Sequence, residues 1–302
     1  MKRILVTGGN GLVGSQFVGE QYVYFSSKDC DLRNVTQTEN LFKDDWDAII
    51  HCAAKVGGLG GNMNFKGEFF YDNIMMNTNV IESARKFGVK NLVAFLSTCI
   101  FPAEVEYPLT EKKIQLGPPH TSNDAYAYAK RMADVQIRAY REQYGLNYKC
   151  VIPTNIYGPH DNFDIENGHV VPSLIHKCYI AKRDNTDLVV WGTGNPLREF
   201  IFSQNIGSLT QRILDEYEGA GPIILSTSEE ISIRELVETI AKAMDYRGKI
   251  IFDSTKPDGQ YRKPTSNRKL MSFLPKYKFT SLENGINRTV DWFVNNYRSC
   301  RK

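Results

Sequence analysis

The sequence contains no long apolar run. No segment of the 302 residues approaches the ~18 consecutive apolar residues of a membrane-spanning helix. The apolar stretch near the amino terminus is too short for a secretory signal peptide. The six cysteines form no CxxC pair and no close spacing, so they predict neither a zinc site nor a disulfide scaffold. These absences indicate a soluble, cytoplasmic protein with reduced thiols and no metal.

A strong charge of either sign is also missing. The chain has 37 lysines and arginines against 34 aspartates and glutamates, a formal net charge of +3. The basic residues are scattered, whereas binding to nucleic acid or to an anionic membrane needs a basic patch or stripe. Neither kind of partner is expected.

The sequence does contain an alternation of short apolar runs and helical patterns over its first two thirds. This alternation is typical of a parallel sheet covered by helices. We expect an α/β fold, a Rossmann-like doubly wound parallel sheet with a smaller carboxy-terminal substrate-binding lobe. The expected strands are residues 3–8, 22–25, 48–53, 92–97 and 148–155, and the expected helices include residues 73–88, 127–145, 232–245 and 281–297.

The regular alternation ends after Asn155. Residues 156–174 are rich in Gly, Pro, Asn and Asp, which is typical of a loop that leads into a helix near Val171. We therefore expect an NADP-binding domain at residues 1–165 and a discontinuous substrate-binding lobe at residues 166–302. Part of the segment 196–228 is expected to return to the large sheet.

A glycine-rich turn follows the first expected strand. Gly8, Gly9, Gly11 and Gly14 permit a tight turn and a close approach of the backbone to a pyrophosphate, which the amino terminus of the next helix attracts. By itself such a turn can be only a turn, but its place at the start of a βαβ unit indicates a dinucleotide site. Since only residues 15–21 separate Gly14 from the next strand, the first helix must be short.

The end of the second expected strand distinguishes between the two nicotinamide dinucleotides. An acidic residue there binds the ribose 2′-hydroxyl of NAD, whereas hydroxyl and cationic groups leave room for the 2′-phosphate of NADP. Ser26, Ser27 and Lys28 follow the strand and favour NADP(H). Asp29 could still serve NAD if these residues form an ordinary solvated turn.

Two further patterns carry chemical groups. Ser97 and Cys99 follow an apolar run and would project to the same side if the strand continued through them. Tyr126 and Lys130 are four residues apart, on one face of an expected helix, where an ammonium would lower the pKa of the phenol. Each pattern alone is weak, because an isolated cysteine is usually a small buried hydrophobe and because tyrosines and lysines are common on helix surfaces.

Longer motifs carry a resemblance to a known family. Ser97, Tyr126 and Lys130 together resemble the short-chain dehydrogenase/reductase family, and the chain length is similar to that of its extended branch. STCIFP, HCAAKVGGLGGN, YAYAKRM, PTNIYGPHDNF, GHVVPSLIHK, VWGTGNPLREF and TKPDGQYRK resemble, within that branch, the NADPH-dependent epimerase/reductases of GDP-4-keto-6-deoxy-D-mannose. The resemblance covers nearly the whole chain. It implies inversion at C3 and C5 of the keto-sugar, followed by reduction at C4.

The resemblance also implies the roles of individual residues. Cys99 and His169 would be the acid/base pair of epimerisation, since protons α to a ketone are acidic and inversion needs a base on one face and an acid on the other. Tyr126 would protonate the C4 oxygen during reduction, Ser97 would polarise the carbonyl, and Lys130 would hold the nicotinamide ribose.

The remaining implied contacts fall into two sets. The cofactor would touch Gly8, Gly9, Asn10, Gly11, Leu12, Val13, Gly14, Ser26, Ser27, Lys28, Ala53, Ala54, Phe95, Leu96, Thr98, Pro153, Thr154, Asn155 and Ile156. The GDP-sugar would touch Lys177, Trp191, Arg198, Lys256 and Asp258. A homodimer is implied through the helices at residues 73–87 and 125–144.

Two alternatives remain open. A related member of the branch could act on another GDP-4-keto-sugar, such as a heptose, which the catalytic residues do not distinguish from a hexose. The chain could instead be a non-catalytic NADP-binding protein, against which the presence of all five expected catalytic residues argues.

Overall fold

The computed structural model describes residues 2–57, 59–256 and 258–302. Met1, Gly58 and Pro257 lie outside the described residues. The motifs HCAAKVGGLGGN and TKPDGQYRK, which contain Gly58 and Pro257, are therefore each described except for one residue.

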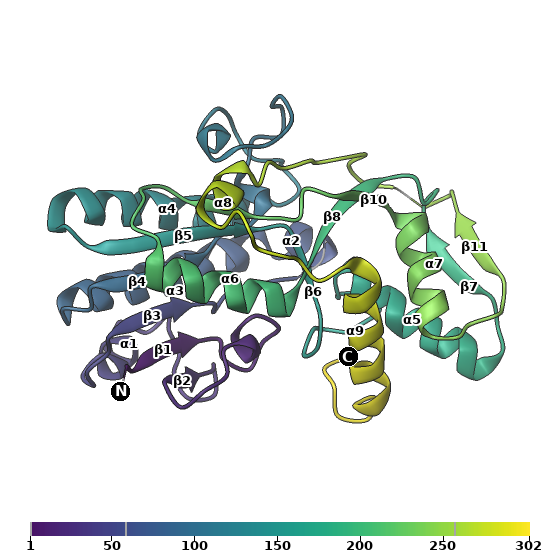
Figure 1. Ribbon diagram of the computed structural model, residues 1–302, viewed down its shortest axis with the longest axis horizontal. Coiled ribbons are helices and arrows are strands. Elements are labelled where there is room, and N and C mark those ends of the chain that lie inside the picture. Colours follow the sequence, from purple (N-terminus) through teal and green to yellow (C-terminus); the bar gives the residue numbers. More distant parts are fainter. Residues whose placement is uncertain (1, 58, 257) are drawn as a thin grey trace.

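The larger part of the structure is a parallel sheet of six strands (Figure 1). Every neighbouring pair in it is parallel, and the strand order has the switch of direction that defines a doubly wound fold. In spatial order the strands are β2 (Tyr22–Phe25), β1 (Ile4–Thr7), β3 (Ala48–His51), β4 (Asn91–Phe95), β5 (Asn147–Pro153) and β9 (Ile223–Leu225). The expected fold class and the five expected strands are confirmed, and β9 is the return of the chain to this sheet.

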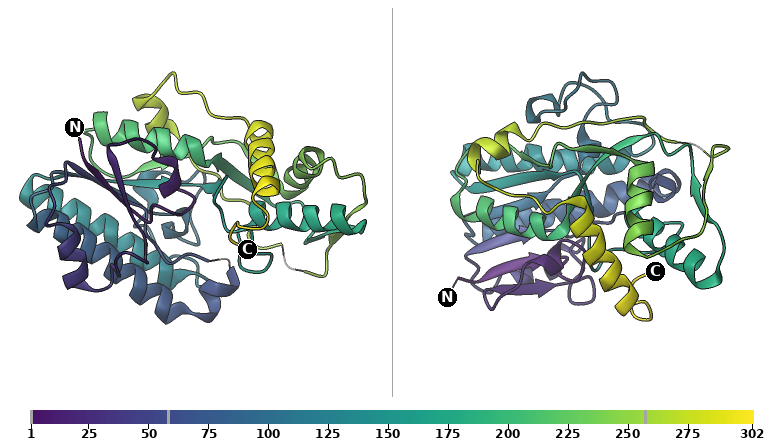
Figure 2. Two further views of the ribbon diagram at one scale, coloured as in Figure 1. Left: turned by 90° about the horizontal axis from the view of Figure 1, so that it is seen from below. Right: turned by 45° about the vertical axis from the view of Figure 1, so that its right-hand side comes forward.

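Helices cover both faces of the sheet, which explains why most residues of its inner strands are buried and apolar. Leu5 and Ile49 belong to one core with residues of α3, while Ile4 and Val6 belong to a second core with residues of α6. In Figure 2 the blue and teal helices of the first face lie opposite the green α6. The first face carries α1 (Val35–Leu41), α3 (Lys66–Lys86) and α4 (Asp124–Tyr144), with α2 (Leu59–Asn64) preceding α3; the second carries α6 (Ser203–Glu216) and α8 (Arg268–Phe273).

The carboxy-terminal part of the chain builds a third core around Phe163, Ile175 and Phe293. Its strands form two small sheets, one of β10 (Glu230–Ser232), β8 (Leu197–Phe202) and β6 (Asn155–Tyr157), the other of β11 (Ile250–Asp253) and β7 (Leu188–Trp191). Its helices are α5 (Val170–Asp184), α7 (Ile233–Ala243) and α9 (Leu282–Asn295). Because β6 follows β5 after one residue, the chain passes from the large sheet into this lobe at Thr154.

Three local expectations need correction or refinement. The strand expected at residues 92–97 ends at Phe95, and residues 98–100 form a 3-10 helix, η2 (Thr98–Ile100); a second one, η3 (Glu111–Lys113), precedes α4. The helix expected at residues 73–88 begins earlier, at Lys66. The short first helix is confirmed and is a single 3-10 turn, η1 (Gly14–Gln16).

Both glycines expected to end helices do so. Gly88 and Gly145 have positive φ angles of 77° and 65°, a conformation that glycine adopts without the steric cost of a Cβ. None of the helices in the described part of the chain has the length and apolar character needed to cross a bilayer.

Candidate active site

The glycine turn lies between β1 and η1 and is closely packed. Gly8 has a φ of +71°, and a Cβ added to it would lie 2.9 Å from the backbone nitrogen of Ala53. A Cβ on Gly14 would lie 2.3 Å from the carbonyl oxygen of Gly8. The backbone after β3 therefore lies directly against the turn, and the contact of Ala53 with the cofactor stays a prediction.

Backbone N–H groups are the anion-binding feature of this turn. Within the described residues, the amides of Asn10, Leu12 and Val13 donate to no protein acceptor, so they are free to bind a phosphate. The expectation that a helix dipole attracts the pyrophosphate is wrong here, since the three-residue η1 aligns too few peptide dipoles. Ala54 follows Ala53 on the same connection and is only partly buried.

The turn after β2 is organised by Asp29. Its Oδ2 accepts hydrogen bonds from the backbone nitrogen of Ser26 at 2.8 Å and from the Ser26 hydroxyl at 2.7 Å. These bonds lower the pKa of Asp29. One carboxylate oxygen is thus used within the turn, while Ser27 and Lys28 remain exposed, as a site for a 2′-phosphate requires.

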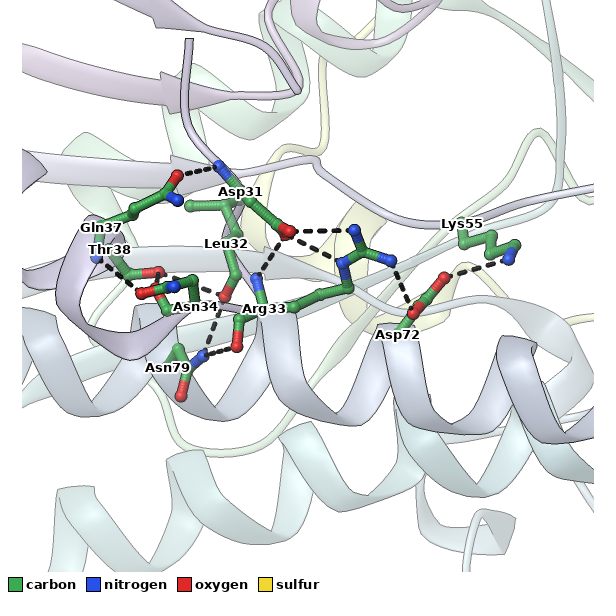
Figure 3. Close-up of polar contacts among 9 residues, drawn as sticks. All are labelled: Asp31, Leu32, Arg33, Asn34, Gln37, Thr38, Lys55, Asp72 and Asn79. Atoms are coloured by element: carbon green, nitrogen blue, oxygen red, sulfur yellow. Dashed lines mark hydrogen bonds and ion pairs between the residues drawn. The ribbon is translucent and has the colours of Figure 1, made fainter. Parts of the chain in front are cut away.

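The loop that follows this turn is fixed on α3 (Figure 3). The Arg33 guanidinium donates to both carboxylate oxygens of Asp31 and, at 3.1 Å, to Asp72 of α3. The Lys55 ammonium lies 3.0 Å from Asp72 as well, and Asn79 Nδ2 donates to the carbonyl oxygens of Leu32 and Arg33. The loops after β2 and β3 are therefore tied to one helix, and Arg33 is engaged by carboxylates instead of facing the turn.

Ser97 and Cys99 are adjacent, but not through strand alternation as expected. Ser97 is the N-cap of η2, and its hydroxyl accepts a hydrogen bond from the backbone nitrogen of Cys99 at 3.4 Å. Burial raises the pKa of the Cys99 thiol, and the Ser97 hydroxyl and the ammonium groups of Lys263 and Lys130 act in the opposite direction. The turn follows the end of β4, where Phe95 and Leu96 are buried.

Tyr126 and Lys130 share one face of α4, as predicted. The Lys130 ammonium, 1% exposed, lies 6.0 Å from the centroid of the Tyr126 ring and donates to the Phe95 carbonyl oxygen at 2.9 Å. The expectation that Lys130 lowers the pKa of Tyr126 is not met, because burial dominates and raises the pKa of the phenol. Burial also lowers the pKa of Lys130 to about 8.

A pocket of about 430 Å³ lies where β4 and β5 end. Thr98 lines it from η2, Thr154 and Asn155 from the passage between β5 and β6, and Arg198 from β8, so residues predicted for cofactor and for substrate meet in one cavity. This is the edge at which open α/β sheets bind their ligands. Pro153 and Ile156 flank the same strand end in β5 and β6.

Three residues of this pocket were not predicted, namely Glu199, Gln260 and Lys263. The Glu199 carboxylate is buried and accepts hydrogen bonds from the backbone nitrogen of Thr265 at 2.9 Å, from its hydroxyl at 2.6 Å and from Ser226 at 2.9 Å. It therefore holds the segment that carries Gln260 and Lys263 against the pocket. The only sequence signal for Lys263 was its place in the motif TKPDGQYRK.

The other predicted substrate residues form a second cluster. The Lys177 and Lys256 ammonium groups lie 4.6 and 5.7 Å from the centroid of the Trp191 ring, which is 59% exposed. Both carboxylate oxygens of Asp258 accept hydrogen bonds from Thr193, so Asp258 fixes the loop after β7. Arg198 Nη1 donates to the Leu197 and Tyr261 carbonyl oxygens. An exposed aromatic plane beside two cations suits a base and a diphosphate.

His169 is the N-cap of α5. Its side chain remains accessible, yet the surrounding protein lowers the pKa of the imidazole because desolvation disfavours the imidazolium. Within the described residues no hydrogen bond joins His169 to Cys99. Their pairing across a sugar stays a prediction.

The parallel sheet, the glycine turn and the Ser97, Tyr126 and Lys130 group define a dinucleotide-binding oxidoreductase of the extended short-chain dehydrogenase/reductase type. The model of the NAD dependent epimerase/dehydratase family matches residues 4–225, and the chain belongs to that family. A GDP-L-fucose synthase of Dictyostelium discoideum is 48% identical over 100% of this chain and 98% of its own length.

Solved structures agree with this assignment. A GDP-L-fucose synthetase of Naegleria fowleri bound to NADP has 44% identity and a TM-score of 0.95, with 100% of this chain and 95% of that chain covered. A GDP-6-OMe-4-keto-L-xylo-heptose reductase of C. jejuni has 23% identity and a TM-score of 0.89, over 98% of both chains, which shows the fold alone. The predicted family, fold and epimerase/reductase class are confirmed.

Proposed function

We propose that this chain is an NADP(H)-dependent epimerase/reductase that converts GDP-4-keto-6-deoxy-D-mannose to GDP-L-fucose. The full-length similarity to GDP-L-fucose synthases supports the assignment of the substrate. One structural observation supports the location of the active site. The pocket at the ends of β4 and β5 is lined both by Thr98, one residue before Cys99, and by Arg198, the cation expected to bind the diphosphate.

The residues of the glycine turn fit the cofactor. A Cβ on Gly8 or Gly14 would meet the backbone of Ala53 or of Gly8, so the glycines allow the turn to close tightly, and the amides of Asn10, Leu12 and Val13 supply hydrogen-bond donors. When bound, NADPH supplies a hydride to C4. The exposed Ser27 and Lys28 hold the 2′-phosphate, and the Lys130 ammonium holds the nicotinamide ribose.

Two sets of side chains perform the two reactions. Cys99 and His169 exchange protons at C3 and C5 on opposite faces of the sugar, which is possible only while C4 is a ketone, since the carbonyl makes the α-protons acidic. The Tyr126 hydroxyl then gives its proton to the C4 oxygen, and Ser97 donates a hydrogen bond to the same oxygen. Reduction therefore comes last.

The test is NADPH oxidation with GDP-4-keto-6-deoxy-D-mannose, followed by determination of the product's stereochemistry. Inversion at both C3 and C5 supports the proposal, and a product that keeps the manno configuration at these carbons contradicts it. A higher kcat/KM with a GDP-4-keto-heptose would favour the heptose alternative. Binding of NADPH without turnover of either sugar would favour a non-catalytic protein.

A homodimer is proposed through α3 and α4. These helices pack side by side and expose Phe70, Tyr71, Tyr128, Met132 and Val135, each between 37% and 56% accessible. Such a group of apolar side chains on neighbouring helices favours a protein interface. The cytoplasmic location and the lack of nucleic-acid or membrane partners stay predictions.

A further inference from the structure

Gln260 is a residue of the pocket for which no role has been given above. It lies on the segment between β11 and α8, and it lines the same cavity as Thr98 and Arg198. Its side chain is an amide, which can offer either N–H donors or a carbonyl acceptor to a ligand. The hydrogen bonds around Gln260 decide which of the two a ligand meets.

The backbone that follows Gln260 is held from two sides. The buried Glu199 accepts two hydrogen bonds from Thr265, as described above. Leu109, on the loop before η3, donates from its backbone nitrogen to the Pro264 carbonyl oxygen at 2.8 Å. The segment is therefore tied both to β8 and to the loop before η3, and its course past the pocket is fixed.

Tyr107, on the same loop, sets the orientation of the Gln260 amide. The Tyr107 hydroxyl donates to the Arg262 carbonyl oxygen at 3.1 Å and accepts from Gln260 Nε2 at 2.8 Å. The carbonyl oxygen can only accept, so the single proton of the hydroxyl is used there, and the amide must turn its nitrogen toward Tyr107. Among the described residues, Gln260 Oε1 accepts no hydrogen bond. An acceptor is thus left for a ligand in the pocket.

The ligand group that fits an acceptor is a hydroxyl. In the expected keto-sugar, C1 carries the diphosphate, C4 the ketone and C6 a methyl group, so the hydroxyls are those of C2 and C3. The C3 hydroxyl changes face when C3 is inverted, whereas the C2 hydroxyl keeps its configuration. A fixed acceptor can hold the sugar through both inversions only at C2.

The position of Arg198 agrees with C2. A Cβ built on Gly259 would lie 3.7 Å from Arg198 Nη2, so the backbone just before Gln260 passes beside this guanidinium. Arg198 is the cation expected to bind the diphosphate, and C2 is the ring carbon next to the one that carries the diphosphate. A side chain that follows Gly259 is therefore placed for the C2 hydroxyl.

We propose that Gln260 is a specificity-determining residue whose Oε1 accepts a hydrogen bond from the C2 hydroxyl of the GDP-sugar, and that Tyr107 is the positioning residue that orients the amide. This inference rests on the proposed function. The contact recognises the sugar and takes no part in proton or hydride transfer. Its loss should raise KM for the keto-sugar and leave kcat within about 2-fold of the wild-type value.

The test is a cycle that combines a variant with a change in the ligand. Calorimetry measures the affinity of the NADP⁺-bound chain for GDP-L-fucose, for its 2-deoxy and 3-deoxy analogues, and for GDP. In Gln260→Met we expect about 3- to 10-fold weaker binding of GDP-L-fucose and of the 3-deoxy analogue, which corresponds to one neutral hydrogen bond. The 2-deoxy analogue and GDP should bind both chains equally, because they lack the C2 hydroxyl.

Tyr107→Phe tests the orientation of the amide. Without the phenol oxygen the amide can rotate, so we expect about 2- to 5-fold weaker binding, again only for ligands with a C2 hydroxyl. Gln136 and Tyr140 of α4 are the matched controls, since Gln136 Nε2 donates to the Tyr140 hydroxyl, which donates to Glu82. Neither residue lines the pocket. Gln136→Met and Tyr140→Phe should bind all four ligands like the wild-type chain.

Four results would overturn the proposal. They are unchanged binding of GDP-L-fucose by Gln260→Met, a full loss with the 2-deoxy analogue, an equal loss with GDP, and no binding of GDP-L-fucose by the wild-type chain. If the wild-type chain binds GDP-L-fucose and shows the coupling to the C2 hydroxyl but turns over no keto-sugar, the proposed function fails while the role of Gln260 is supported.

Discussion

At the scale of single residues, burial decides the protonation of the site more than neighbouring charges do. The Tyr126 phenol and the Cys99 thiol both have raised pKa values because they lie in a low-dielectric environment. A neutral phenol is a proton donor, which suits reduction. A thiol with a raised pKa is mostly protonated at neutral pH, whereas the Ser97 hydroxyl and the ammonium groups of Lys263 and Lys130 lower the pKa and so favour the thiolate.

Replacing Cys99 should separate the two reactions. In Cys99→Ser the much less acidic hydroxyl cannot serve as the base, so we expect deuterium incorporation at C3 and C5 to fall by about 10²- to 10⁴-fold. Hydride transfer to a pre-epimerised ketone should change little, since Tyr126 and Lys130 are intact. Parallel losses in both assays would remove Cys99 from its assigned role.

The reductive step should decline in alkaline solution. Burial lowers the pKa of Lys130 to about 8 from 10.5, so its charge, needed to hold the nicotinamide ribose, is lost as pH rises through about 8. Stability changes in the opposite sense, because between these two values the unfolded chain binds more protons, which raises the free energy of unfolding with pH.

The pH–rate profile of reduction with a pre-epimerised ketone measures this decline. Lys130→Arg, whose guanidinium stays protonated, should lack the alkaline limb even though its absolute rate is lower. A profile for Lys130→Arg that still falls near pH 8 would assign the limb to another group.

At the scale of elements, the dinucleotide site depends on a turn and on strand ends. The turn between β1 and η1 offers backbone amides, and the loops after β2 and β3 are tied to α3 through Asp72 and Asn79. Anion binding at this turn depends little on a helix dipole, because η1 is only three residues long. Close packing of glycine backbones is the feature that substitution should disrupt.

Gly14→Ala tests that packing. Its Cβ would lie 2.3 Å from the Gly8 carbonyl oxygen and 2.6 Å from the Gly9 Cα, both backbone atoms, so the turn must move. We expect a loss of about 1–3 kcal/mol in the free energy of unfolding and ~10-fold weaker NADPH binding in a fluorescence titration.

Gly67→Ala is the matched control, since a Cβ on this glycine of α3 meets nothing within 4 Å. It should be neutral or stabilising by about 0.5–1 kcal/mol and should bind NADPH like the wild-type chain. Equal binding by Gly14→Ala and Gly67→Ala would show that the turn tolerates a side chain.

At the scale of the whole molecule, the site exists because two parts of the chain meet. The pocket is lined by Thr98, which follows β4 of the large sheet, and by Arg198 and Lys263 of the lobe. The chain joins the two parts where β5 of the large sheet passes into β6, which pairs with β8 in the lobe, and where β9 returns to pair with β5. The buried Glu199 lies at this junction and orders the segment that reaches the pocket.

The proposed dimer is tested at the same scale. Tyr71 and Val135 are 56% and 37% exposed on α3 and α4, so Tyr71→Glu with Val135→Glu should leave the fold intact but desolvate two charges in an interface. Sedimentation should then show a monomer at concentrations where the wild-type chain is a dimer. Val294→Glu, on the exposed side of α9, should not change the sedimentation coefficient.

The sequence pattern was sufficient to locate the helices and strands, but it was not sufficient to locate all of their ends. Apolar runs located five strands of the large sheet, since the inner four are buried on both faces and the edge strand β2 is partly buried. Gly88 and Gly145 located the ends of two helices because they need positive φ. The end of β4 was placed wrongly. The N-cap Ser97 and the 3-10 turn that follows it have no characteristic hydrophobic periodicity. The sequence pattern therefore does not distinguish these residues from a continuation of the strand.

The sequence by itself determined the fold class, the position of the glycine turn and the shared helix face of Tyr126 and Lys130, because these depend on local periodicity, backbone sterics and short spacings. Only the tertiary structure decided that Lys263 and Glu199 belong to the same pocket as Thr98, and that burial raises the pKa of Tyr126. The physical reason is that charge compensation and desolvation depend on which groups become neighbours across the whole chain, and spacing along the sequence does not report that.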